Sequence, residues 1–103
     1  MNNMSRVAFG SSRHPDQDRA LLDSVAAGDQ EALECFYDRW GRMVYSLALS
    51  IVRNVADAEE VTQDVFLRVW DNAERFDLGL GSVPGWLSVI TRRLAIDRTR
   101  SRL

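Results

Sequence analysis

The chain has 103 residues, 46% of them apolar, which suffices for a single small domain with a hydrophobic core. Its net charge of −2 hides an asymmetry that indicates two partners of opposite charge, because residues 57–77 hold seven acids and two arginines whereas residues 86–103 hold five arginines and one aspartate. Cys35 stands alone, which excludes an internal disulfide, and the absence of a long apolar run or signal peptide predicts a cytoplasmic protein without membrane insertion.

Residues 1–15 are polar and irregular, which predicts a flexible N-terminal tail ahead of one helical domain over residues 16–103. Periodic apolar residues predict four helices in that domain, at about 17–27, 30–53, 57–73 and 84–101. Gly28 is expected to end the first helix and Asp29 to cap the second. We therefore expect an all-α fold, a compact four-helix bundle with no sheet.

The helix predicted at residues 57–73 has two faces of opposite chemistry. One arc is apolar, and we expect its residues to be buried with two from the preceding helix: Val61, Val65, Phe66, Val69, Val44 and Leu47. The opposite arc is largely acidic and holds one leucine: Asp57, Glu60, Gln63, Asp64, Leu67 and Asp71. Acids in a first turn complement the helix dipole, but those further along the helix do not. This arc suits docking on a basic partner, and a plain solvated helix face is the alternative interpretation.

Residues 75–85 form the longest connection between predicted helices and contain spaced glycines and a proline. A loop of this length in a small bundle favours a functional role. Phe76 lies at its start, where it is either buried beneath the loop or available for contact. Ser82 is expected to cap the last helix and Pro84 to lie in its first turn.

The last predicted helix combines arginines with small hydroxyl residues. Leu87, Ile90 and Leu94 are expected to face the core. The opposite side is expected to be exposed and carries the following residues: Ser88, Thr91, Arg92, Ala95, Arg98, Thr99 and Arg102. That composition suits contacts with phosphates and base edges.

Catalytic chemistry has no candidate residues in this sequence. There is no metal-ligand spacing, no nucleophile with a histidine partner and no glycine-rich phosphate loop after a strand. His14, the single histidine, lies in the predicted tail without a second ligand beside it. We therefore predict no enzyme, no catalytic residue, no metal site and no cofactor.

A series of motifs resembles region 2 of the bacterial sigma-70 family, in particular its extracytoplasmic-function (ECF) group. The longest reads DAEEVTQDVFLRVW at residues 57–70, and it is followed by residues 75–77, 81–82, 86–87 and 91–100. Residues 28–33 and 36–40 are similar to the start of that domain, so the resemblance covers about residues 16–102. The chain departs from the pattern at Arg93, where many members have Asn. Full-length members continue into a helix-turn-helix region 4 that reads the minus-35 element, and we expect region 4 to be absent from a chain that ends at Leu103.

The resemblance implies a transcription initiation factor that docks on core RNA polymerase and recognises and melts the minus-ten promoter element. Contacts with the clamp helices of the beta-prime subunit are implied for Glu60, Gln63 and Asp64, with Asp57 and Leu67 beside them. The loop and the last helix would hold a flipped base of the single-stranded non-template strand, through these residues: Phe76, Trp86, Arg92, Arg93 and Arg98. An anti-sigma factor is a further partner that this group commonly has.

A helical protein-interaction module without nucleic-acid binding is the alternative function. The acidic helix would then serve one protein partner, and the arginines would only solvate the last helix. Titration with single-stranded DNA at several salt concentrations separates the two, because counterion release gives a negative slope only where arginines meet phosphates.

Overall fold

The computed structural model describes residues 15–76 and 81–101, and the regular elements in these ranges are all helical. They are α2 (Pro15–Ala26), α3 (Gln30–Val52), α4 (Val55–Asn72), the short 3-10 helix η1 (Ala73–Arg75) and α5 (Val83–Arg100). Residues 1–14, 77–80 and 102–103 lie outside the described residues, and with them most of the predicted tail and the middle of the loop. The four long helices confirm the predicted all-α bundle.

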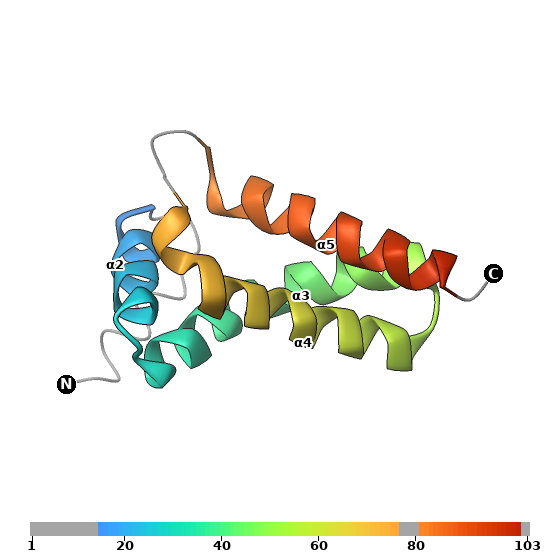
Figure 1. Ribbon diagram of the computed structural model, residues 1–103, viewed down its shortest axis with the longest axis horizontal. Coiled ribbons are helices and arrows are strands. Elements are labelled where there is room, and N and C mark those ends of the chain that lie inside the picture. The colour runs from blue at the N-terminus through green and yellow to red at the C-terminus, as the bar shows by residue number, and fades with distance from the viewer. Residues whose placement is uncertain (1–14, 77–80, 102–103) are drawn as a thin grey trace.

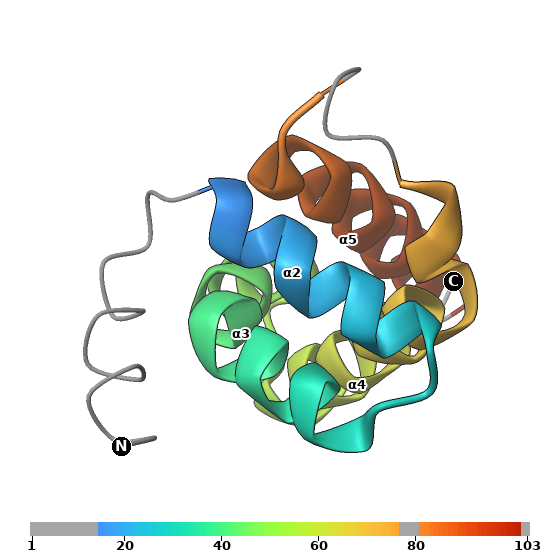
Figure 2. The ribbon, with the colours of Figure 1, turned by 90° about the vertical axis from the view of Figure 1, so that its left-hand side faces the viewer.

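Three of the helices run along the long axis of the molecule, and α2 crosses one end of them. Figure 1 shows α4 and α5 with α3 behind them, and Figure 2 shows α2 lying across the ends of the other three. Because α4 and α5 pack against each other in opposite directions, the last turns of α5 lie beside the first turns of α4.

Local capping explains where the helices begin and end. Asp29 caps α3 by accepting hydrogen bonds from the backbone N–H groups of Glu31 at 2.9 Å and Ala32 at 3.3 Å, as predicted. α3 ends at Arg53, whose φ of 57° lies in the left-handed region. Asn54 then caps α4 by accepting from the N–H of Asp57, so α4 begins two residues earlier than the predicted start.

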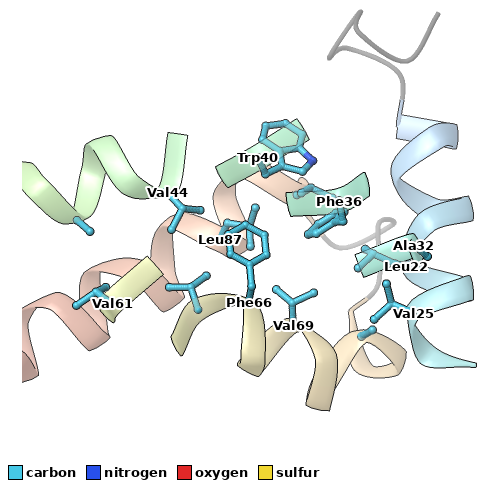
Figure 3. Packing of buried hydrophobic residues seen from close by; sticks show 14 of the residues in the cluster. Leu22, Val25, Ala32, Phe36, Trp40, Val44, Val61, Phe66, Val69 and Leu87 are labelled. Carbon is cyan, nitrogen blue, oxygen red and sulfur yellow. The ribbon is translucent and has the colours of Figure 1, made fainter. Parts of the chain in front are cut away.

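The core lies where α3, α4 and α5 meet, with α2 closing one end (Figure 3). Phe36 of α3 and Phe66 of α4 meet edge to face in it, with ring centroids 6.2 Å apart. Of the residues predicted to be buried, Leu47 is only half-buried. The others are buried as predicted: Val44, Val61, Val65, Phe66 and Val69.

The buried face of α5 differs from the predicted one. Leu87 is fully buried as expected, but Thr91 and Ala95 are fully buried too, whereas they were predicted to be exposed. The Thr91 hydroxyl donates to the carbonyl oxygen of Leu87 at 2.7 Å, so its polar group is satisfied within the helix and its methyl group packs like an alanine or valine. α5 is therefore rotated about its axis relative to the predicted orientation, and Val89 and Ile96 are exposed.

A buried ion pair joins α2 to α3. One carboxylate oxygen of Asp18, Oδ1, accepts from Nε of Arg39 and from Nε1 of Trp40, each at 2.9 Å. Gln17 accepts from Nη1 of the same arginine at 2.9 Å. Both charged side chains are only 6% accessible, so this pair fixes the one helix that crosses the other three.

Candidate functional site

The exposed face of α4 carries a row of residues that we call the acidic stripe: Glu60, Gln63, Asp64, Leu67 and Asp71. All five are exposed, as predicted, and the side chain of Leu67 is 60% accessible. The opposite side of the same helix supplies Val61, Val65 and Val69 to the core, so α4 cannot rotate to cover the stripe without exposing apolar surface. The stripe is therefore a fixed acidic surface with an apolar side chain in it.

Asp57 does not belong to the stripe, and the prediction that it is exposed is wrong. Its side chain is 3% accessible. It lies one helical turn before Val61 and two before Val65, at the edge of the buried arc, where it contacts Arg98 in the last turns of α5. A buried carboxylate needs a counter-charge, and Arg98 of α5 supplies one.

Arg98 bridges the two helices. Its Nε and Nη2 donate to Oδ1 of Asp57 at 3.2 and 3.0 Å, and Nη2 also pairs with Oε1 of Glu60. Partial desolvation lowers the pKa of Arg98, but the hydrogen bond to Asp57 and the charge of Glu60 outweigh it, so the net pKa is raised. The guanidinium is therefore engaged within the bundle instead of projecting freely from it.

A hollow of about 640 Å³ lies between α3 and α4, next to the acidic stripe. It is lined by Tyr37, Asp38, Gly41, Arg42, Tyr45, Glu59, Thr62 and Gln63. Gln63 belongs to both the hollow and the stripe. The two features thus form one continuous surface on this part of the bundle.

A second hollow, of about 580 Å³, lies where the end of α4, η1 and the start of α5 meet. We call it the aromatic pocket, because Phe76 and Trp86 stack in it with ring centroids 4.5 Å apart and an angle of 21° between the rings. Both rings are half-buried and pack against the core, so each of the two interpretations left open for Phe76 holds in part. The volume of the aromatic pocket falls within the range of roughly 300–1,000 Å³ that is usual for ligand sites.

Two arginines that were not predicted as site residues also line the aromatic pocket. Arg68 reaches it from α4 and Arg75 from η1. Asn72 lines it as well, and its side-chain amide donates to the carbonyl oxygen of Arg68 at 2.9 Å. One feature of the sequence could have indicated a role for Arg68 in a site, because it is a basic residue within an acidic segment. It also lies one helical turn before Asn72, so the two side chains share a helix face.

The remaining predicted arginines lie just beyond the aromatic pocket along α5. Val89 lines the pocket, and Arg92 and Arg93 follow it by three and four residues, one helical turn further on. Both arginines are exposed. Phe76 and Trp86 thus lie in the pocket and Arg92 and Arg93 one turn beyond it, whereas Arg98 lies a further five residues along α5 and is bound to α4.

Ser82 caps α5 at the rim of the aromatic pocket. It accepts from the N–H of Gly85 at 3.1 Å, and Pro84 lies in the first turn, both as predicted. Residues 15–76 and 81–101 contain no group of three or more His, Cys, Asp or Glu side chains placed to hold a metal ion. The helices described here also include none that is long and apolar enough to cross a membrane.

Comparison with known proteins identifies relatives with matching sequences. Residues 36–103 match the family described as Sigma-70 region 2. An ECF RNA polymerase sigma factor SigK from Mycolicibacterium vanbaalenii is 45% identical over 82 residues, which cover 80% of this chain and 42% of the relative. A protein of the same name from Mycobacterium bovis is 43% identical over 81 residues, covering 79% of this chain and 43% of the relative. The chain therefore spans less than half the length of the relatives that it matches.

Proposed function

Since the chain belongs to the Sigma-70 region 2 family, we propose that it is the part of an ECF sigma factor that docks on core RNA polymerase and holds the opened minus-ten promoter element. The family consists of transcription initiation factors and not of enzymes, in agreement with the sequence prediction. With core polymerase as its partner, the location that we propose is the bacterial cytoplasm. On the resemblance to the ECF group, an anti-sigma factor is a third partner.

The acidic stripe supports the proposed polymerase contact. Glu60, Gln63 and Asp64 are exposed on one fixed helix face, and Leu67 adds an apolar contact between them and Asp71. An acidic surface of this kind complements a basic coiled coil such as the clamp helices, and charge complementarity speeds encounter and fixes the orientation of docking. Asp57 contributes to this surface indirectly, through its ion pair with Arg98.

The aromatic pocket supports the proposed contact with single-stranded DNA. A flipped base needs an aromatic or apolar pocket and a cationic path for its phosphates. Phe76 and Trp86 provide the aromatic surface. Arg68 and Arg75 line the pocket and supply positive charge there. The exposed Arg92 and Arg93 extend this positive charge along α5.

The observation that carries this function is that the bundle presents two chemically different surfaces, an acidic stripe and an aromatic pocket, which share no residue. The test uses the chain assembled with core polymerase and a fluorescent single-stranded oligonucleotide of the non-template minus-ten element, titrated at several salt concentrations. We expect log Kobs to fall with log salt concentration, with a slope of about −0.7 for each phosphate contacted. A slope near zero, or binding no tighter than to core polymerase alone, would support the protein-interaction module instead.

Replacing Phe76 by Ala is expected to weaken oligonucleotide binding by about 1 to 3 kcal/mol, the scale of one base stacking on an aromatic ring. The loss should be confined to oligonucleotides that carry a base at the flipped position, and an abasic site there should abolish the difference from the parent. Because Phe76 also packs on Trp86, thermal unfolding of the variant is measured alongside. A native melting temperature together with unchanged base discrimination would show that the base binds elsewhere.

Replacing Arg92 by Ala is the matched control for a phosphate contact. Affinity is expected to fall by the same factor for all sequences, and the salt slope to shrink by about 0.7. Arg92 is exposed, so the melting temperature should stay unchanged. A sequence-dependent loss would contradict the assignment to phosphate.

A further inference from the structure

Arg98 was expected to contact DNA, but in the structure it is committed to α4. Three polar contacts join it to side chains 38 and 41 positions earlier, two to Asp57 and one to Glu60. The three side chains differ in exposure, since Asp57 is 3% accessible, Arg98 35% and Glu60 56%. The contacts therefore run from a buried carboxylate through a half-buried guanidinium to an exposed carboxylate.

Each end of this chain of contacts has a different physical role. Asp57 is fixed by burial and by the cap of α4, where its own N–H donates to Asn54 at 2.9 Å. A carboxylate held in this way orients the planar guanidinium of Arg98, because two of its N–H groups converge on one oxygen. The same Nη2 then meets Oε1 of Glu60, which restricts a long side chain that would otherwise sample many rotamers in water.

We propose that Arg98 is a positioning residue for polymerase docking, which holds the Glu60 carboxylate in a fixed place at the start of the acidic stripe. Oε1 faces Arg98, and a carboxylate has lone pairs on both oxygens, so the second oxygen is left to accept from a basic partner. Restricting the side chain before binding lowers the entropy lost on binding. The inference rests on the proposed function, in which Glu60 contacts the polymerase.

The test is a double-mutant cycle on the affinity of the chain for core RNA polymerase. Four proteins are compared: the parent, Arg98→Ala, Glu60→Gln and the double variant. Arg98→Ala is expected to weaken binding about fivefold, the low end of coupling between two sites. In the Glu60→Gln background the same substitution is expected to have a much smaller effect, because the amide oxygen of Gln accepts a weaker hydrogen bond and no longer carries the charge that attracts a basic partner.

Several outcomes would overturn the proposal. An equal loss in both backgrounds would show a general structural effect, and unchanged or tighter binding by Arg98→Ala would show that Arg98 is neutral or masks Glu60. If Arg98→Ala instead left polymerase affinity unchanged and reduced the salt slope for the minus-ten oligonucleotide by about 0.7, Arg98 would be a phosphate contact. If instead Glu60→Gln alone leaves polymerase affinity unchanged, the failure lies in the assigned docking surface and not in the link through Arg98.

Two further variants control for folding and for charge. Arg98→Ala leaves Asp57 buried without this counter-charge, so the cycle is repeated in an Asp57→Asn background, which removes the buried charge with its partner. Arg100→Ala removes the same charge from an exposed position two residues away on the same helix, and it is expected to leave polymerase affinity unchanged. A loss with Arg100→Ala equal to that with Arg98→Ala would show an effect of net charge alone.

Discussion

Reversing the charge of Asp64 by Asp64→Arg is expected to weaken binding to core RNA polymerase by about 100-fold or more, with the melting temperature unchanged. Asp64 is exposed near the middle of the acidic stripe, and substitutions at such positions usually alter stability by no more than about 0.5 kcal/mol. Placing a like charge against a basic partner costs several kcal/mol, and each 1.4 kcal/mol is about a factor of ten in affinity. The loss of binding should therefore be large and separable from folding.

The measurement is a direct titration of core polymerase with labelled variant and parent, with thermal unfolding of both. Asp97→Arg makes the same charge change at an exposed position of α5 and is the matched control. Glu60→Arg is less suitable as a first variant, because it would place a cation against Arg98 above the buried Asp57. Polymerase affinity equal to that of the parent in Asp64→Arg would remove the stripe as the docking surface.

The opposite faces of α4 were predictable because their cause is local. Burial of Val61, Val65 and Val69 follows from helical periodicity alone, and it fixes the direction in which Asp64 and Leu67 point. The caps of α3 and α5 were predictable for the same reason, since Asp29 and Ser82 act within three residues of themselves. Local chemistry thus accounts for the helices and for most of the acidic stripe.

The features that escaped prediction depend on contacts between helices. Asp57 lies at the edge of two arcs, and its burial depends on the packing of α5, whose Arg98 contacts it. The orientation of α5 differs from the predicted one because a threonine counts as polar in a sequence pattern, whereas Thr91 satisfies its hydroxyl within its own helix. The aromatic pocket joins residues from three elements, so Arg68 and Asn72 could not be assigned to it from spacing alone.

The ion pair between α2 and α3 also joins residues far apart in sequence, and it carries the largest expected effect on stability. Asp18→Ala is expected to lower the free energy of unfolding by about 3 kcal/mol, since it removes the carboxylate that faces the buried guanidinium of Arg39. Asp18 accepts from both Arg39 and Trp40, so two donors lose their acceptor at once. For a domain of this size the loss corresponds to a drop in Tm of about 15 °C.

Urea unfolding of parent and variants gives the free energies directly. Asp23→Ala removes an exposed acid from the same helix and should change the free energy of unfolding by less than about 0.5 kcal/mol. Asp18→Leu combined with Arg39→Met should recover part of the loss, because it removes both charges of the buried pair, whereas Nε1 of Trp40 still lacks the acceptor that Asp18 supplied. If Asp18→Ala were no less stable than Asp23→Ala, the packing of Leu22 and Val25 would be enough to hold α2 across the bundle, and the ion pair would serve only to fix its orientation.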